Sequence, residues 1–446
     1  MQKNATKIFI ILGFFVVSIL LVVLMVYLIE RANRPEPIPE VNQTELELNE
    51  SQRIYNKLLF DYKMVRKTNN YYNDNYLISP LALGYMLKVL EEGAGSETRG
   101  QFTTLIKNYE LPKIVNIDKK ISIATALFIN TVYKGKLNSN YVNSVAHNYN
   151  ANTMYDSFTS TDGVNNWVNG KTFGQITRAV NSLDRNSKFT IINTIALNID
   201  WKQKMNSINT HKATFTKIDN TPIEVAMMSD KNAFGYLDNA NAYGIVKHFA
   251  TLDKDTGGFA TAETTNKLDL EYIALIPKTD INDYVNNTLD QYELSKLLST
   301  VKVNNNTTDL IMNIPKYYYA FGLDNLKIIL NENDITNAFD PEKADFSGIN
   351  NELYLTDTLH RTYLELGENG TMAADVSLKN QYALDADQGK EKIEVNFNKP
   401  FIYLIKEKNS TNLWMFGIVY EPMLWEEYEK LIETAQREAE RAKRGY

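Results

Sequence analysis

The distribution of apolar residues divides this chain of 446 residues into an apolar N-terminal stretch and a long mixed region. Residues 8–29 carry no charge, and as a helix they would span about 33 Å, enough for the roughly 30 Å core of a bilayer. The stretch ends in Leu28-Ile29-Glu30-Arg31, without a small-residue cleavage site. It therefore predicts an uncleaved transmembrane signal anchor after a short tail, residues 1–7, with a buried core helix as the alternative.

The next segment, residues 30–45, has proline at every second position from Pro35 to Pro39. Because such sequences favour extended polyproline geometry, we expect a semi-rigid linker here. Apolar residues at helical spacing then predict a helix over Leu46–Arg66. This helix would open a globular domain that we place at residues 46–422.

The periodicity of the globular region mixes helices and strands. Ser79 can cap a helix, Pro80 fits its first turn and Gly93 can end it. Apolar or alternating runs predict strands at residues 121–132, 189–199, 268–276, 355–366 and 393–397. Polar residues 251–266 predict an exposed hairpin tip. The pattern as a whole indicates an α+β fold.

The end of the chain has a helical period of its own. Past Pro422, one apolar stripe is formed by Leu424, Tyr428, Leu431, Ala435, Ala439 and Ala442. Opposite charges lie four residues apart on the remaining surface, as in Glu433 and Arg437. We predict an amphipathic helical tail at residues 423–446, and favour a solvated helix over a coiled-coil or partner-binding segment.

Composition narrows the function. The formal net charge of −7 argues against nucleic acid as a partner, because phosphate binding needs a basic face. The absence of cysteine excludes disulfides, zinc–thiolate sites and thiol catalysis. The four histidines lie in no metal-binding or catalytic motif. We therefore expect no metal, no cofactor and no enzymatic activity, with a catalytic triad assembled only in space as the alternative.

A long polar segment separates two of the predicted strands. Residues 367–392 connect the strand at 355–366 to the strand at 393–397, and this exceeds an ordinary connection in a compact domain. Its first part contains small residues, Thr371, Ala373 and Ala374, which would fit a strand if space were made for one. Loops of this length usually carry function or are disordered.

This segment, Glu368-Asn369-Gly370-Thr371 followed by Ala373 and Ala374, resembles the proximal hinge of the serpins, the serine protease inhibitor family. Further stretches similar to family motifs follow the family order: 75–87 (with Ala82 where the family has a second serine), 93–98, 121–129, 165–176, 189–201 and Met227-Met228. The resemblance implies an α+β serpin fold with a large central mixed sheet, two further sheets, about eight to nine helices and an exposed reactive-centre loop.

The resemblance also implies a suicide mechanism. A serine protease attacks the scissile bond and forms an acyl-enzyme, and the cleaved loop then enters the main sheet as a new strand and distorts the protease. Family spacing from Gly370 places the bond at Leu384-Asp385, or one or two residues away, with Tyr382 and Lys379 as less favoured baits. Leucine on the acyl side suits chymotrypsin-like, elastase-like or subtilisin-like proteases with an apolar primary pocket.

Family positions assign roles to other residues as well. Glu368 and Lys316 match the pair that bridges the top of the opening sheet near Trp201, the breach. The polar cluster beneath the sheet centre, the shutter, corresponds to Ser79, Asn193 and His360. Without the resemblance, each of these residues has a simpler reading as a satisfied buried polar group or a surface ion pair.

Asp375 departs from the hinge pattern. Strand side chains alternate between faces, so Asp375 shares one face with Thr371, Ala373 and Ser377. The resemblance implies that this face turns inward on insertion, where a lone carboxylate is costly. A non-inhibitory serpin that is a protease substrate or binds a partner or ligand is therefore the alternative to inhibition.

The predicted anchor implies a single-pass cell-membrane protein, with the globular domain expected to be extracellular. Asn369-Gly370-Thr371 is a glycosylation sequon, and a glycan there would block insertion of the loop. Together with the absence of cysteine, this favours a bacterial cell-surface protein. We expect a monomer.

Overall fold

The computed structural model describes residues 59–107, 109–371 and 384–443. The predicted anchor at residues 8–29 and the linker at 30–45 lie outside these ranges. Within them, no helix combines the length and apolar character needed to cross a membrane. Residues 46–58 of the helix predicted over 46–66 also lie outside the described ranges. The first described helix, α3, spans Phe60–Asn69, and Leu59 before it has extended backbone angles of φ −57° and ψ 134°. The predicted helix is therefore not continuous through Leu59.

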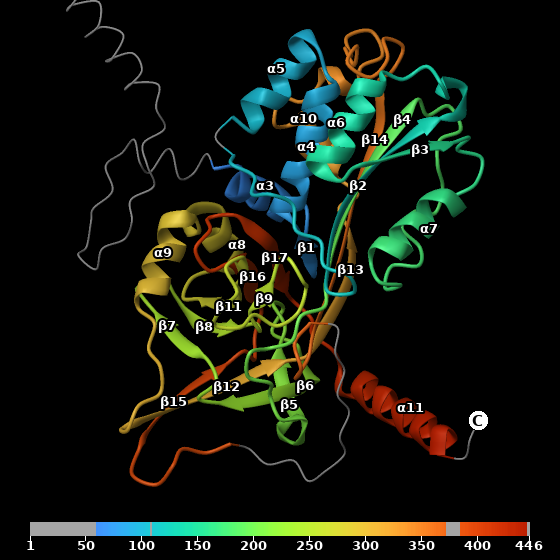
Figure 1. Ribbon diagram of the computed structural model, residues 1–446. Helices are drawn as coiled ribbons and strands as arrows, with labels where there is room; N and C mark the ends of the chain where they lie inside the picture. Colours follow the sequence, from blue (N-terminus) through green and yellow to red (C-terminus); the bar gives the residue numbers. More distant parts are fainter. Residues whose placement is uncertain (1–58, 108, 372–383, 444–446) are drawn as a thin grey trace, which may run out of the picture. The chain divides into compact units, whose positions relative to one another are not determined.

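The sheet that organises the domain has five strands, in the order β13-β14-β4-β2-β3. Their bounds are β13 Tyr317–Gly322, β14 Leu355–Leu366, β4 Phe189–Leu197, β2 Ile121–Asn130 and β3 Asn152–Asp156. We call it the central sheet (Figure 1). β13 pairs antiparallel with β14, and β2 pairs antiparallel with β4, whereas β4 and β14 run parallel to each other. This parallel junction is called the seam.

Two further large sheets and a short hairpin complete the strands. The six-stranded sheet contains β1 Tyr76–Ile78, β17 Leu413–Val419, β16 Phe401–Glu407, β11 Leu270–Pro277, β8 Ala242–His248 and β7 Gly235–Asp238. The four-stranded sheet contains β15 Glu391–Asn396, β12 Thr308–Pro315, β6 Pro222–Lys231 and β5 His211–Thr216. The hairpin pairs β9 Leu252–Asp253 with β10 Lys267–Leu268, so residues between these strands form its tip, as predicted.

The helices cover the sheets and bury apolar faces against them. After α3, their bounds are α4 Pro80–Gly93, α5 Ser96–Leu105, α6 Ser139–Tyr149, α7 Asp162–Lys171, α8 Ile281–Asp283, α9 Gln291–Ser299, α10 Leu326–Asn331 and α11 Trp425–Lys443. Short 3-10 turns lie at 131–133, 207–209 and 337–339, and a π-turn at 284–288. The start of α4 is as predicted, because the Ser79 side chain caps it and Pro80 occupies its first turn.

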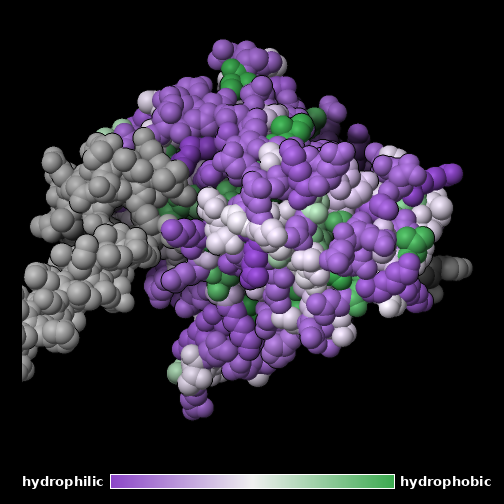
Figure 2. Space-filling model, turned by 90° about the horizontal axis from the view of Figure 1, so that it is seen from above, coloured by the Kyte–Doolittle hydropathy of each residue, from purple (hydrophilic) through white to green (hydrophobic). Residues whose placement is uncertain are grey.

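Two apolar cores meet at the central sheet. One surrounds α4, where Leu83, Leu87 and Leu90 are fully buried, and each such side chain stabilises the fold by about 1.5–3 kcal/mol. The other joins the carboxyl end of β4 to the four-stranded sheet through residues such as Leu197 and Met312. The molecular surface in Figure 2 is mostly hydrophilic, with small separate apolar areas. The helices and sheets confirm the α+β class expected from the sequence.

Candidate functional site at the seam of the central sheet

At the seam, β4 and β14 run parallel to each other, and each has an antiparallel neighbour on its other side. The sheet has one other parallel pair among the described strands, β2 with the edge strand β3. Its ladder runs from Leu355 opposite Phe189 to Tyr363 opposite Ala196. All nine residues of β4 are buried. A strand that entered here from the end of β14 would run antiparallel to both sides, which is the more stable pairing.

The loop that follows β14 turns back at once towards the end of the seam at which both β4 and β14 finish. Gly367 and Gly370 exchange backbone hydrogen bonds, in which Gly367 N–H donates to the Gly370 carbonyl at 3.0 Å. Thr371 N–H then donates to the Ile199 carbonyl at 2.9 Å, and Thr371 Oγ1 accepts from Ile199 N–H at 2.7 Å. Thr371 is 1% exposed. The first small residue of the loop therefore already lies between the ends of the two seam strands.

The backbone at Gly370 requires glycine. Its φ is +146°, and a Cβ atom there would lie 2.0 Å from the Ile199 carbonyl oxygen. A side chain would be strained by the dihedral angle and would collide with rigid backbone. This turn therefore depends on Gly370, which the resemblance assigns to the hinge.

The three residues assigned to the breach lie together. Glu368 Oε2 is 2.5 Å from Lys316 Nζ, its Oε1 accepts from Thr210 Oγ1 at 2.5 Å, and both charged residues are at most 2% exposed. The Trp201 indole N–H donates to the Gly367 carbonyl at 2.9 Å. Removing one member of such a buried pair typically costs about 3–5 kcal/mol, because the other charge is left without a partner.

The shutter residues also meet, across the seam and the start of α4. His360 Nε2 accepts from Ser79 N–H at 3.0 Å, and His360 Nδ1 lies 3.0 Å from Asn193 Oδ1. Since the Ser79 amide can only donate, the ring proton is on Nδ1 and is donated to Asn193. Burial, helped by nearby Arg361, lowers the pKa of His360 to about 3, so the ring is neutral at physiological pH. Asn193 in turn donates to Thr125 at 2.9 Å.

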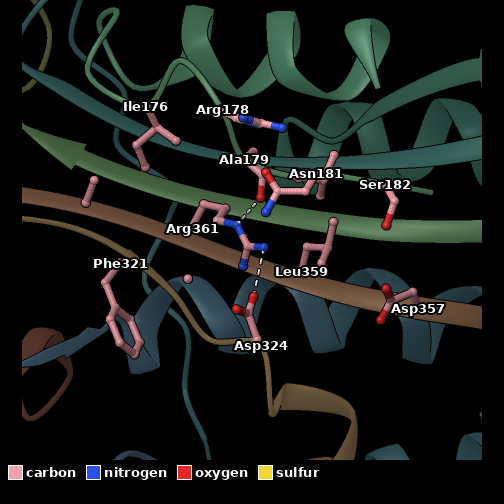
Figure 3. A pocket seen from close by; sticks show the side chains of 13 residues that line it. Ile176, Arg178, Ala179, Asn181, Ser182, Phe321, Asp324, Asp357, Leu359 and Arg361 are labelled. Atoms are coloured by element: carbon pink, nitrogen blue, oxygen red, sulfur yellow. Dashed lines mark hydrogen bonds and ion pairs between the residues drawn. The ribbon is translucent and has the colours of Figure 1, made fainter. Parts of the chain in front are cut away.

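A further contact across the seam lies in a cleft on the outer face of β14 (Figure 3). The cleft has a volume of about 430 Å³. In it, Arg361 Nε donates to the Ala179 carbonyl at 2.7 Å, and its terminal nitrogen lies 2.9 Å from Asp324. Ala179 belongs to the segment that connects α7 to β4. Arg361 therefore ties β14 to the segment that leads into its seam partner.

The far end of the loop is held by an ionic cluster that sequence reasoning missed. Asp309 has a fully buried side chain and accepts from Asp387 N–H at 2.6 Å, from Lys390 Nζ at 3.0 Å and from Asn232 at 3.2 Å. Lys231 Nζ bridges Asp309 and Asp387 at 2.9 and 2.6 Å. These contacts, first among them the Asp387 amide, hold the pKa of Asp309 well below its usual range. We call Asp309, Lys231, Asp387 and Lys390 the distal clamp.

The clamp ties the segment before β15 to β12 and β6. It could not be found from the sequence, because its members come from three separate stretches and follow no shared spacing.

The predicted scissile residues lie just before this clamp. Leu384 is half-buried and Asp385 is exposed, with Lys392 Nζ 3.6 Å from its carboxylate. Ala373, Ala374 and Asp375 of the predicted hinge lie outside the described residues. No group of three or more His, Cys, Asp or Glu side chains in the described ranges is placed to hold a metal ion.

Comparisons with known proteins agree with this geometry. A family profile described as serpin (serine protease inhibitor) matches residues 56–422. The alpha-1-antiproteinase of Rattus norvegicus is 24% identical over 386 residues, which cover 81% of this chain and 86% of that protein. The leukocyte elastase inhibitor of Xenopus laevis is 24% identical over 392 residues, covering 81% and 97%. By name, both relatives are inhibitors of proteases.

Solved structures show the same fold. The thermophilic serpin tengpin in its native state has a TM-score of 0.66 and 24% identity, covering 86% of this chain and 97% of that one. Thyroxine-binding globulin in complex with thyroxine has a TM-score of 0.67 and 19% identity, covering 83% and 100%. The serpin fold expected from the sequence is therefore confirmed for the described domain.

Proposed function

Because this chain belongs to the serpin family, we propose that it is a suicide inhibitor of serine proteases with an apolar primary pocket, and not an enzyme. The bait is the Leu384-Asp385 bond. The serine Oγ of the protease attacks the Leu384 carbonyl, and the peptide bond breaks. The nitrogen of Asp385 takes a proton and leaves as a new amine, while Leu384 stays bound to the protease as an ester.

The observation that carries this proposal is the position of Thr371. It is hydrogen-bonded to Ile199 between the ends of two parallel strands, and the bridges from Gly370 to Asp200 and from Thr371 to Leu366 are both antiparallel. Further insertion would replace one parallel contact by two antiparallel ladders, so each inserted residue gains backbone hydrogen bonds. The uninserted fold is then kinetically trapped, and cleavage would release the strain.

The two ends of the cut loop are held differently, which supports a trap. The distal clamp and β15 hold the chain after Asp385 to the four-stranded sheet. Cleavage would separate the chain before Leu384 from this clamp, and that chain could then follow Thr371 into the seam. A protease esterified to Leu384 would be carried away from Asp385, and the reverse reaction would lose its nucleophile.

The bridges formed by Gly370 and Thr371 also fix a register for an inserted strand. Counted in that register, Ser377 comes level with His360 on β14 and with Asn193 on β4. These are the residues whose hydrogen bond now spans the seam. The register therefore supports a shutter role for this pair.

The second candidate function is a non-inhibitory serpin, and Asp375 favours it. In the same register Asp375 comes level with Thr362 and Ile195, both fully buried. A carboxylate there costs several kcal/mol unless it is paired or protonated. Slow insertion would let the protease hydrolyse the ester and leave, so the protein would be a substrate. Among similar structures, thyroxine-binding globulin binds thyroxine, and a ligand-binding role is the corresponding alternative here.

For location, we propose that residues 8–29 anchor the chain in a cell membrane and that the Pro-rich linker holds the domain outside. The support is the uncharged length of that stretch. Protease added to intact cells should remove the domain; protection of the domain until the cells are lysed would contradict this orientation.

The inhibitor proposal is tested with the full-length chain in mild detergent, mixed with chymotrypsin, elastase and subtilisin. A protease–inhibitor band that survives boiling in denaturant, together with a released peptide that begins at Asp385, is expected. Clean cleavage near Leu384 without a complex, but with a rise in thermal stability, would favour the substrate alternative. Cleavage without any gain in stability would refute loop insertion altogether.

A further inference from the structure

The helix after the family-matched region, α11, packs against the domain. The family profile ends at residue 422, and α11 spans Trp425–Lys443. Trp425, Tyr428 and Ile432 are at most 6% exposed and form a small apolar cluster with Met423 of the preceding segment and Ala226 of β6. The solvated tail favoured from the sequence is therefore wrong for this face. Leu431, which the sequence placed on the apolar stripe, is 45% exposed.

The segment that leads into α11 is joined to Lys316 through the backbone. Met423 N–H donates to the Lys316 carbonyl at 2.9 Å, and Lys316 N–H donates to the Ala226 carbonyl at 2.8 Å. Ala226 N–H completes the triangle by donating to the Met423 carbonyl at 3.3 Å. Lys316, which connects β12 to β13, is thus fixed between β6 and the start of the tail.

The Lys316 side chain is held from two sides. Its Nζ lies 2.5 Å from Glu368 Oε2 and 4.9 Å from the centroid of the Tyr428 ring. Tyr428 is 1% exposed and Lys316 is 2% exposed, so the ring covers the ammonium group and keeps water from the ion pair. Cation–π contacts are strongest when they are desolvated in this way.

We propose that Tyr428 is a positioning residue for loop insertion: it holds the Lys316 ammonium against Glu368, so that α11 helps to set the rate at which the seam opens. Glu368 stands just after the end of β14, and its grip on Lys316 keeps that end against the strands β12 and β13. The carbonyls of Gly367 and Asn369, on either side of Glu368, accept hydrogen bonds from Trp201 in the segment that follows β4. Loosening the grip on Glu368 therefore loosens these contacts, and the carboxyl end of β14 can then move away from β4. This inference rests on the proposed loop-insertion function.

The test measures entry of a strand into the uncleaved, full-length protein. The probe is a synthetic peptide of residues 371–384 with an N-terminal fluorophore, and the readout is its rate of stable uptake. Tyr428→Leu, which keeps an apolar side chain but removes the π face, should take up the peptide about tenfold faster or more. Tyr428→Phe, which keeps the ring, should restore a rate near that of the wild type. Leu431→Ala, on the exposed face of the same helix, is the matched control.

A double-mutant cycle separates positioning from general stability. In a Lys316→Met background, Tyr428→Leu should have no further effect on uptake, because there is no ammonium group left to hold. An unchanged uptake rate for Tyr428→Leu would overturn the inference, and so would a rate increase of the same size in the Lys316→Met background.

The same series distinguishes this inference from the proposed function. A wild-type protein that takes up no peptide and gains no thermal stability on loop cleavage would overturn both. If the wild type takes up the peptide and gains thermal stability on loop cleavage, and Tyr428→Leu takes up the peptide at the same rate, only the role of Tyr428 would be overturned.

Discussion

Lowering the pH should destabilise this fold through His360. The ring is fully buried, with Nε2 accepting from Ser79 and Nδ1–H donating to Asn193. A second proton would have to sit on Nε2, facing the Ser79 amide hydrogen. Burial lowers the pKa of His360 to about 3 in the folded protein, against about 6.5 in an unfolded chain.

The sign and size follow from these two values. As the pH falls below about 6.5, the unfolded chain binds a proton that the folded chain does not bind until about pH 3. The stability contributed by neutral His360 is thus complete above this window and is lost as the pH falls through it. At about pH 4.5 the loss spans two pH units, or roughly 3 kcal/mol. Because the folded ring is still unprotonated there, this figure depends only on the ordinary pKa of histidine.

The assay is urea-induced unfolding of the full-length chain at about pH 7.5 and about pH 4.5. We compare the wild type with His360→Gln, which can still accept from the Ser79 amide but cannot titrate. Between the two pH values, the wild type should lose about 3 kcal/mol more than the variant. His147→Gln, at an exposed position on α6, is the matched control and should behave as the wild type. An equal pH dependence in wild type and His360→Gln would refute the reasoning.

Three further substitutions test other parts of the argument. Burial raises the pKa of Asp61 to about 7, so the folded protein keeps a proton that the unfolded chain loses near pH 4. The free energy of unfolding should therefore fall as the pH rises from about 4 to about 7. In urea unfolding, Asp61→Asn should remove about 4 kcal/mol of that fall. Asp309→Asn breaks the distal clamp, and limited trypsin digestion followed by mass spectrometry should show at least about tenfold faster cleavage after Lys390. Asp375→Ala removes the carboxylate from the inward face and should raise the fraction of protease trapped per inhibitor cleaved, measured on denaturing gels.

Each of these has a control. Asp118→Asn, at an exposed carboxylate, should change neither the pH dependence of unfolding nor cleavage after Lys390. Leu378→Asp places a carboxylate on the opposite, outward face of the inserted strand and should leave the trapped fraction unchanged. A trapped fraction that stays the same or drops in Asp375→Ala would count against an inward Asp375. If Asp61→Asn keeps the wild-type pH dependence of unfolding, burial does not raise the pKa of Asp61. If trypsin cleaves Asp309→Asn after Lys390 at the wild-type rate, the distal clamp does not protect that bond.

The sequence predicted the elements whose pattern is local. The strand at 355–366 has the bounds of β14, and Ser79 with Pro80 marks the start of α4, because alternation and capping depend on neighbouring residues. The strand predicted over 121–132 ends two residues early, where Asn130 caps a 3-10 turn.

Other features depend on partners far along the chain. Asp309 of the distal clamp binds Lys231 and Asp387, each 78 positions away along the chain, and no periodicity marks such a contact. The tail shows the same limit on a smaller scale. The sequence placed Leu431 on the apolar stripe of α11, but Leu431 is exposed, whereas Ile432 is buried in one cluster with Trp425, seven residues before it. A sequence pattern predicts the buried face of a helix to within about one residue. The surface against which the helix packs decides which of two neighbouring residues is buried.

The interactions that close the seam lie in a fixed order along β14. A loop that enters from the carboxyl end of β14 first meets the backbone hydrogen bonds between β14 and β4, which at that end start with Tyr363. It then meets Arg361, tied to Ala179 on the outer face, and next His360, bonded to Asn193 on the inner face. Since adjacent strand residues point to opposite faces, these two ties lie on opposite faces of the sheet. Opening the seam at this level therefore has to overcome a contact on each face.

If the loop inserts as we propose, the residues that arrive with it have opposite effects on these steps. Ser377 comes level with His360, where its hydroxyl can accept the Nδ1–H that Asn193 gives up, so the buried ring avoids a penalty of about 1–3 kcal/mol for an unpaired donor. Asp375 has no such exchange, because the hydroxyl of Thr362 beside it already donates to a backbone carbonyl of β1. Ser377 therefore favours insertion and Asp375 opposes it. Asp375 must be buried before Ser377 can reach His360, so the free energy of burying that carboxylate should govern whether the protein acts as a trap or as a substrate.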